Sequence, residues 1–89
     1  MLEFRITGLV QGVGFRYSTA QEAKRLKLRG WVRNTRDGAL EGEAAGPASE
    51  LQEFRAFLNK GPSGARVDKA DVREREGDEH LPSGFEVRH

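Results

Sequence analysis

The chain has 89 residues, with 15 basic and 14 acidic side chains, a formal net charge of +1 and no cysteine. This length suits one compact domain, over residues 1–89, with room for about two helices and one sheet. The interspersed charges argue against a dedicated nucleic-acid binder, which usually carries a basic stripe, and the lack of cysteine excludes disulfides and thiolate metal sites.

No segment approaches the ~20 apolar residues that a membrane helix needs. Residues 1–5 contain no basic stretch leading into an apolar run, so we expect no signal peptide. These features predict a cytoplasmic protein without a membrane partner.

The first third of the chain changes from a strand pattern to a helix pattern. Residues 2–7 alternate apolar and polar side chains, which predicts a strand with one buried face that ends at Gly8. Residues 10–14 contain two glycines and predict a loop. A helix is predicted next, because its inward positions recur at helical spacing, at Phe15, Thr19, Ala23 and Leu26.

The middle of the chain predicts a hairpin. Residues 29–34 and 40–45 have strand patterns, and the Asp-Gly pair at residues 37–38 signals a tight turn between them. The second of these strands places Glu41 and Glu43 on one side, which suits exposure to solvent.

A second helix has clear start and stop signals. Gly46 at the N-cap and Pro47 at the first helical position predict its beginning. Lys60 in the last turn and Gly61 just beyond it predict its end.

Two further strands complete the pattern. In residues 65–74 the apolar positions change phase, which predicts a bulge near Asp68 and Lys69, and residues 85–87 predict a short last strand. Two helices inserted among strands, two of which form a hairpin, favour an α+β, ferredoxin-like two-layer sandwich. We expect both helices on one face of a mostly antiparallel sheet of four to five strands.

The loop at residues 10–14 is a candidate anion site. The first N–H groups of a helix lack intrahelical partners and the helix dipole favours negative charge there, while Gly12 and Gly14 allow the backbone N–H groups to converge. The loop lacks the Lys-Ser/Thr pair of a P-loop and the third glycine of a dinucleotide fingerprint. The alternative is an ordinary tight connection between a strand and a helix.

Arg16 strengthens the interpretation as a phosphate site. A cation in the first helical turn opposes the helix dipole, at a cost of roughly 0.3–1 kcal/mol. A guanidinium beside convergent N–H groups suits a phosphate, because it can contact two oxygens at once. The alternative is that Arg16 pairs with an acidic side chain or with the C-terminal carboxylate.

Asn34 opens the predicted hairpin turn. Asparagine is a common turn residue for local reasons, and this is one interpretation. The functional interpretation is that its amide orients a water molecule, since an amide both donates and accepts hydrogen bonds without acting as a base.

Three segments match the signatures of a known family. Residues 8–16 read G-L-V-Q-G-V-G-F-R and resemble the acylphosphatase signature G-x-V-Q-G-V-x-F-R, which precedes the first helix. Residues 30–38 read G-W-V-R-N-T-R-D-G and are similar to the second signature, G-W-V-R-N-x-x-D-G. Residues 61–67 resemble the family's G-P-x-x-A-x-V stretch, so the resemblance covers essentially the whole chain in order.

The resemblance implies a ferredoxin-like enzyme that hydrolyses a small acyl phosphate to a carboxylate and inorganic phosphate, with no cofactor, no metal and no covalent intermediate. It places the catalytic roles on Arg16 and Asn34, with Thr35 supporting the asparagine. We expect a monomer without a nucleic-acid partner. The residues implied to bind the substrate, through the backbone N–H groups of the loop, are Gln11, Gly12, Val13, Gly14, Phe15 and Arg16.

Three residues depart from the family pattern or match nothing in it. Lys27 stands where many members have glycine; a left-handed conformation there would strain it by about 1 kcal/mol. His80 and His89 match nothing catalytic, and we expect both on the surface.

Two other functions are alternatives to the hydrolysis of acyl phosphates. A ferredoxin-like RNA-binding module would display aromatic side chains on its open sheet face, whereas the polar positions here include Glu3, Glu41 and Glu43. Similar domains also occur inside a larger hydrogenase-maturation protein that handles carbamoyl phosphate.

Overall fold

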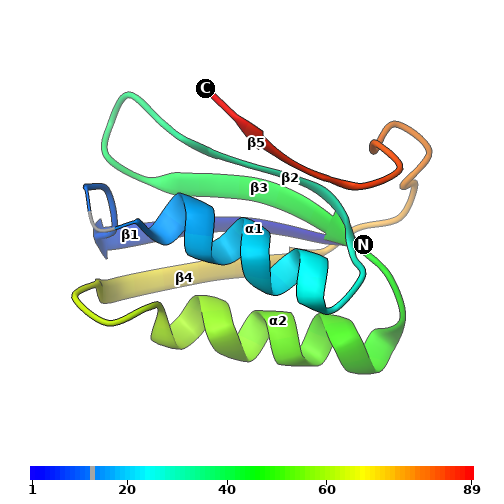
Figure 1. The fold of residues 1–89 in the computed structure, drawn as a ribbon, viewed down its shortest axis with the longest axis horizontal. Coiled ribbons are helices and arrows are strands. Elements are labelled where there is room, and N and C mark those ends of the chain that lie inside the picture. The colour runs from blue at the N-terminus through cyan, green and yellow to red at the C-terminus, as the bar shows by residue number, and fades with distance from the viewer. Residues whose placement is uncertain (13) are drawn as a thin grey trace.

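The computed structural model describes residues 1–12 and 14–89, and its elements follow the predicted order (Figure 1). The elements are β1 (Leu2–Leu9), α1 (Phe15–Arg25), β2 (Arg29–Asn34), β3 (Leu40–Ala45), α2 (Ala48–Lys60), β4 (Arg66–Glu74) and β5 (Phe85–Arg88). The strands form one five-stranded sheet in the order β4-β1-β3-β2-β5. Neighbouring strands are antiparallel except β2 and β5, and both helices cover the same face, which confirms the predicted ferredoxin-like α+β sandwich.

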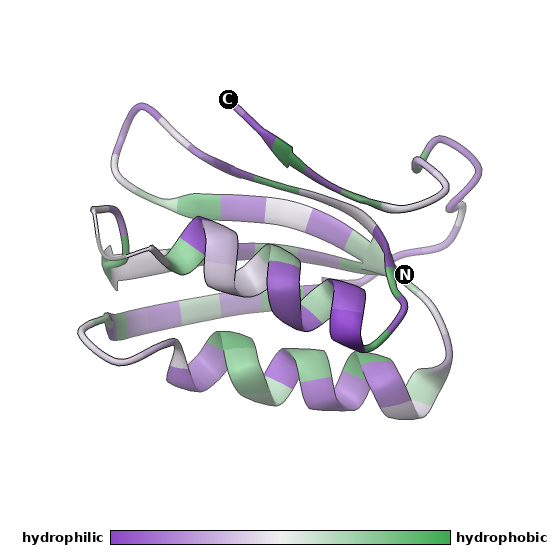
Figure 2. Cartoon of the chain, in the orientation of Figure 1, coloured by the Kyte–Doolittle hydropathy of each residue, from purple (hydrophilic) through white to green (hydrophobic). Residues whose placement is uncertain are grey.

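The core lies between the sheet and the helices. Hydrophobic and hydrophilic residues alternate along both helices in Figure 2, as expected for elements with one buried face. Phe54 of α2 packs edge-to-face on Phe4 and on Phe85, with ring centroids 5.6 and 6.0 Å apart. Aromatic pairs of this kind hold α2 onto the inner strands as well as onto the outer strand β5.

The start of α1 is packed into the same core. The ring of Phe15, the first residue of α1, is buried and lies edge-to-face on Phe57 of α2 at 6.0 Å. This contact fixes the position of the helix N-terminus, which follows the glycine loop directly.

The first strand is longer than predicted. β1 continues through Gly8 to Leu9, because this part of the strand still pairs with β4. A side chain at Gly8 would bring its Cβ within 2.2 Å of the carbonyl oxygen of Arg66, so only glycine allows this close approach. The predicted bulge is confirmed: Thr7 pairs with Lys69 and Gly8 with Val67, so that Asp68 is the extra residue.

The beginning of α2 also differs from the prediction. The helix begins at Ala48, with Pro47 rather than Gly46 at the N-cap. Pro47 has an extended ψ of 150°, and its carbonyl accepts the first helical hydrogen bond from Leu51 N–H at 3.0 Å. Proline therefore precedes the first helical residue here, since its fixed φ of −61° is compatible with either position.

Lys27 adopts the left-handed conformation, with φ 58°, and it is the only non-glycine residue in the described part of the chain with a positive φ. It follows Leu26, the C-cap of α1, and its N–H donates to Lys24 O at 3.0 Å. The strain considered from the sequence is therefore present.

We predict that Lys27→Gly raises the free energy of unfolding by about 0.5–1 kcal/mol, because glycine adopts positive φ without a Cβ clash. Urea unfolding followed by circular dichroism measures this change. Lys24→Gly, within the exposed face of α1, is the matched control and should lower stability by about 1 kcal/mol. A destabilised Lys27→Gly variant would contradict the prediction.

Candidate active site

The glycine loop leads into the N-terminus of α1, whose partial positive charge no side chain of the described residues neutralises. Gly14 is the N-cap of α1 in the left-handed conformation, with φ 74°, and no side chain caps the helix. The first turn contains no acidic residue, in contrast to α2, which has Glu50 there. Gly12 is also left-handed, with φ 77°, and left-handed residues in such loops turn backbone N–H groups toward one concave side. The N-terminus of α1 can therefore receive an anion.

Arg16 lies in this first turn. Within residues 1–12 and 14–89 it forms no ion pair, so the structure does not favour the alternative in which an acidic side chain or the C-terminus neutralises it. Its guanidinium carbon lies 5.4 Å from the ring centroid of the exposed Tyr17. Its Nε is buried and has no hydrogen-bond partner among the described residues. Arg16 thus carries a positive charge that no residue of the described chain pairs with.

The side chain of Gln11 joins the loop to the turn after β2. Its Nε2 donates to the carbonyl oxygens of Thr35 and Ala39, at 2.9 Å each. The sequence predicted a role for the backbone of Gln11 in substrate binding, and its side chain in addition holds the neighbouring turn. The loop and the turn are consequently fixed relative to each other.

The predicted hairpin turn is confirmed. Asn34 is the last residue of β2 and pairs with Leu40, the first residue of β3. Thr35 N–H donates to Ala39 O at 2.9 Å, and Ala39 N–H donates to the Thr35 hydroxyl oxygen at 3.0 Å. Thr35, predicted to support Asn34, therefore closes the turn from both its backbone and its side chain.

A short chain of polar contacts continues from Thr35 to the open face of the sheet. The Thr35 hydroxyl donates to a carboxylate oxygen of Asp37, and the other carboxylate oxygen pairs with the guanidinium of Arg5 on β1. These two contacts hold the pKa of Asp37 below its usual range, the hydroxyl being the larger cause. Arg5 also lies 3.6 Å from Glu41 on β3.

The side-chain amide of Asn34 takes no part in the hydrogen bonds that close the turn. Its side chain is on the same face of β2 as the buried Val32, two residues earlier, which is the face that the helices cover. Its Oδ1 is buried and lacks a partner among the residues that the structure describes. No hydrogen bond from Nδ2 is found in this part of the chain either, so the amide can accept and donate at the same time.

The structure thus places Gln11, Gly12, Gly14, Phe15 and Arg16 in one segment that enters α1, beside the turn of Asn34 and Thr35. Phe15 contributes its backbone at the helix start, because its side chain is in the core. Val13, predicted to bind substrate, lies outside the described residues.

An open hollow near Asn34 contains a residue that the sequence did not connect with the site. His89 is exposed, as predicted, and lines this hollow together with Asn34, Thr35 and Arg36. No spacing in the sequence indicates this proximity, since β5 reaches β2 only through the parallel pairing of the two strands. The hollow has further cationic lining from Arg5 and Arg33.

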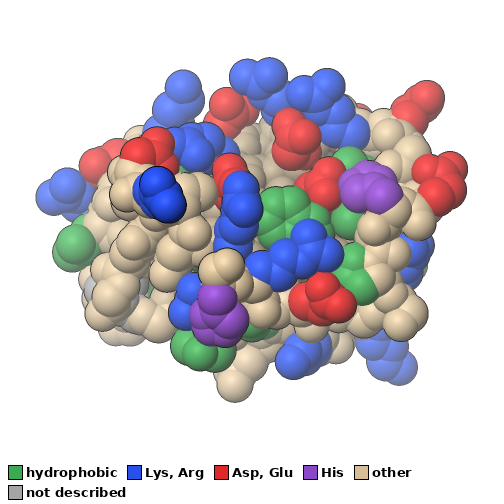
Figure 3. All heavy atoms as spheres, turned by 90° about the horizontal axis from the view of Figure 1, so that it is seen from above, with side chains coloured by type: hydrophobic (Ala, Val, Ile, Leu, Met, Phe, Trp, Pro, Cys, Tyr) green, Lys and Arg blue, Asp and Glu red, His purple; other side chains and the backbone are tan. Residues whose placement is uncertain are grey.

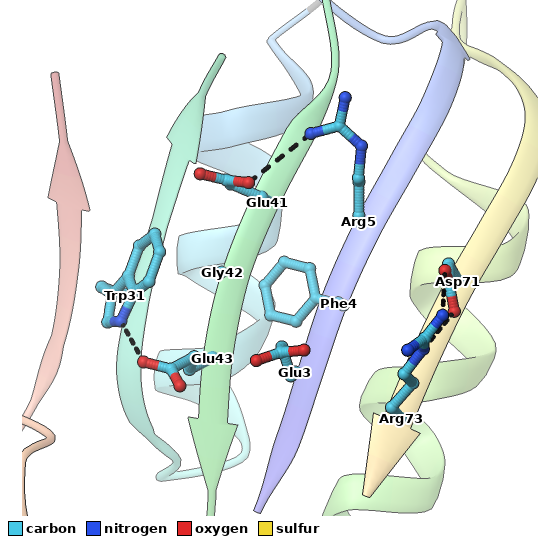
Figure 4. Close-up of a pocket in the computed structure, with 9 residues that line it drawn as sticks. All are labelled: Glu3, Phe4, Arg5, Trp31, Glu41, Gly42, Glu43, Asp71 and Arg73. Carbon is cyan, nitrogen blue, oxygen red and sulfur yellow. Dashed lines mark hydrogen bonds and ion pairs between the residues drawn. The ribbon is translucent and has the colours of Figure 1, made fainter. Parts of the chain in front are cut away.

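A second hollow, of about 330 Å³, lies on the open face of the sheet (Figure 4). Trp31 Nε1 donates to Glu43 there at 2.8 Å, and the carboxylate of Asp71 pairs with Arg73. Four acidic and two basic side chains line the hollow, and charges of both signs are interspersed on the surface seen in Figure 3. On this face, the described residues thus mix both charges, whereas nucleic-acid binders usually carry a basic stripe.

Residues 1–12 and 14–89 contain neither a cluster of metal-ligating side chains nor a helix that could span a membrane. No group of three or more His, Cys, Asp or Glu side chains is placed to hold a metal ion. None of the helices described is both long and apolar enough to cross a membrane.

Known proteins resemble this chain along its length. A family model described as Acylphosphatase matches residues 2–87. Acylphosphatase 2 of Ralstonia nicotianae is 49% identical over 84 residues, which cover 93% of this chain and 86% of that protein. The crystal structure of acylphosphatase from Bacillus subtilis superposes with a TM-score of 0.90 at 38% identity, covering 100% of both chains. Full-length HypF superposes at a TM-score of 0.77 and 27% identity, but only over 12% of its own length.

The sandwich and the loop entering α1 define a small ferredoxin-like protein with a candidate anion site at its first helix. The matches to sequence and structure then make the assignment more specific. The chain belongs to the acylphosphatase family.

We predict that Gln11→Ala lowers the free energy of unfolding by about 0.5–1.5 kcal/mol, because the carbonyls of Thr35 and Ala39 each lose one of their donors. Thermal and urea unfolding measure this loss. Gln52→Ala, an exposed glutamine on α2, is the control and should change stability by less than about 0.5 kcal/mol. Equal stabilities of the two variants would show that the Gln11 contacts do not hold the turn.

The lowered pKa of Asp37 predicts a pH dependence. A carboxyl group whose pKa is lower in the folded state stabilises the fold above its unfolded pKa of ~3.9, and this stabilisation is lost as the pH falls through the folded value. The difference in melting temperature between the wild type and Asp37→Asn should therefore be constant near neutral pH and shrink below about pH 4. A difference that grows on acidification would contradict the assignment.

Proposed function

We propose that this protein hydrolyses acyl phosphates, as its relatives' name states, and that the loop at residues 11–16 with Arg16 binds the phosphoryl group. The observation that carries the proposal is Arg16: a cation in the first turn of an uncapped helix, without an ion pair in the described chain. A bound dianion converts the repulsion between this charge and the helix dipole into attraction. The match to the family supports the same substrate class.

Catalysis in this proposal rests on positioning and charge. The loop N–H groups and the guanidinium hold the phosphoryl oxygens and stabilise the charge that develops on them. The Asn34 amide holds a water in line with the bond from phosphorus to the acyl oxygen. The water oxygen bonds to phosphorus while that bond breaks, and the carboxylate leaves with the electron pair. A substrate oxygen accepts the proton of the water.

The architecture supports a division of roles between the two residues. Arg16 belongs to α1 and Asn34 to β2, and the side chain of Gln11 connects the two segments. Binding and charge stabilisation therefore fall to the loop and Arg16, whereas attack by water depends on Asn34. We propose that the protein acts as a cytoplasmic monomer and a single domain, with no cofactor.

Two substitutions separate these roles. Asn34→Ala should lower kcat for benzoyl phosphate by 10²–10³-fold, as for the loss of one catalytic donor, and still bind inorganic phosphate. Arg16→Ala should lose turnover and phosphate affinity together, because it removes both contact and charge. Phosphate release measures kcat, and product inhibition measures phosphate affinity.

Matched controls are available in the chain. Asn59→Ala removes the other asparagine, whose amide donates to Arg55 O on α2, and Arg55→Ala removes an exposed arginine of the same helix. Both variants should keep wild-type kcat. Treatment with EDTA should not change activity, since no proposed step uses a metal. Near-normal kcat in Asn34→Ala would exclude the water-positioning role.

A further inference from the structure

Three buried side-chain polar atoms have no hydrogen-bond partner among the described residues: Arg16 Nε, Thr19 Oγ1 and Asn34 Oδ1. Buried polar atoms are almost always hydrogen-bonded in folded proteins, so each exception requires an explanation. Two of these atoms belong to the residues proposed to be catalytic. The third belongs to Thr19, which helical spacing assigns to the apolar side of α1.

Thr19 is unusual for its position. Its exposed fraction is 0%, and it is the only fully buried polar residue in the described part of the chain. A threonine hydroxyl inside a helix commonly donates to the carbonyl four residues earlier, here that of Phe15. That hydrogen bond is not formed in the described structure. The hydroxyl is therefore buried without the local partner that would make it a purely structural group.

The three atoms belong to one interface. Thr19 follows Arg16 by three residues on α1, so the two side chains are neighbours on the helix surface. α1 packs against β2, and Asn34 is on the helix-covered face of that strand. Arg16 and Asn34 also stand at the same end of the sandwich, because Gln11 joins their segments.

The chemistry of the three atoms is complementary. Arg16 Nε–H can only donate, Asn34 Oδ1 can only accept, and the Thr19 hydroxyl can do both. We propose that Thr19 is a positioning residue of the active site, whose hydroxyl is linked as acceptor to Arg16 Nε–H and as donor to Asn34 Oδ1, through one buried water on each side. This proposal rests on the function proposed above.

These two hydrogen-bonded links of Thr19, called the relay below, orient both of the proposed catalytic groups. A hydrogen bond at Nε fixes the plane of the guanidinium and directs its two terminal nitrogens toward the phosphoryl oxygens. A hydrogen bond at Oδ1 fixes the amide of Asn34 and presents Nδ2–H to the attacking water. Thr19 touches neither the substrate nor the attacking water in this arrangement and acts only through Arg16 and Asn34.

Thr19→Val tests the proposal, because valine keeps the shape of threonine and removes only the hydroxyl. The variant should fold with a melting temperature below that of the wild type, because valine preserves the packing but the two hydrogen bonds of the hydroxyl are lost. Its kcat for benzoyl phosphate should fall about 10–100-fold, as for a small misplacement of catalytic groups. KM should change less than kcat, because the loop N–H groups still bind phosphate.

Companion variants separate positioning from packing. Thr19→Ser keeps the hydroxyl and should retain at least about half of the wild-type kcat, whereas Thr19→Ala should show the loss seen with valine even if its stability is lower. Ser18→Ala removes a neighbouring hydroxyl of α1 and should leave kcat unchanged. A folded Thr19→Val variant with wild-type kcat would overturn the proposal, as would equal losses in Thr19→Ser and Thr19→Val.

The same assay distinguishes this proposal from the proposed function. If Asn34→Ala and Arg16→Ala lose activity while Thr19→Val keeps it, the relay is wrong and the proposed function stands. If Asn34→Ala keeps near-normal kcat, the water-positioning role fails, and the relay that depends on Asn34 is overturned with it.

Discussion

The two hydrogen bonds from the Gln11 side chain are the constraint on which the rest of the site depends. One end of this amide belongs to the glycine loop, and the other holds both carbonyls that frame the turn after β2. Without these hydrogen bonds, the position of Arg16 on α1 relative to Asn34 on β2 would depend only on the packing of the helix on the sheet. The side chain of one residue therefore helps to fix the distance between the proposed phosphate site and the proposed water site.

The electrostatics of α1 follow from the same arrangement. The helix begins without a capping side chain or an acidic residue, and it has Arg16 where sequences usually place a carboxylate. Elsewhere on the molecule most arginines are paired, as Arg25 is with Glu22 and Glu53. Arg16 differs from these arginines in that no acidic group among the described residues pairs with it.

Local patterns predicted most of the fold, because strand alternation, helical spacing and turn residues are properties of neighbouring residues. The hairpin and the Asp68 bulge follow from such patterns, whereas the left-handed conformation of Lys27 was considered only because many family members have glycine there. The helix start was misplaced by one residue, since Pro47 suits either side of the boundary. The candidate loop and Asn34 were also indicated, chiefly by their signatures.

What the sequence did not indicate are contacts between distant residues. Gln11 binds carbonyls 24 and 28 residues away, and Arg5 pairs with Asp37 across 32 residues. Thr19 was indistinguishable from a core residue, because periodicity records only which side of the helix is buried. Its missing hydrogen bond becomes visible only when every neighbouring donor and acceptor has been placed.

The Asp68 bulge affects how readily two copies of the molecule associate in a crowded solution. β4 is an outer strand, and one of its edges offers unpaired backbone groups to any other extended chain. The extra residue interrupts the regular spacing of these groups, and the charged residues along the strand, among them Arg66, Lys69 and Asp71, oppose the approach of a second copy. The irregularity that accommodates Gly8 beside Arg66 thereby also protects the sheet from edge-to-edge aggregation.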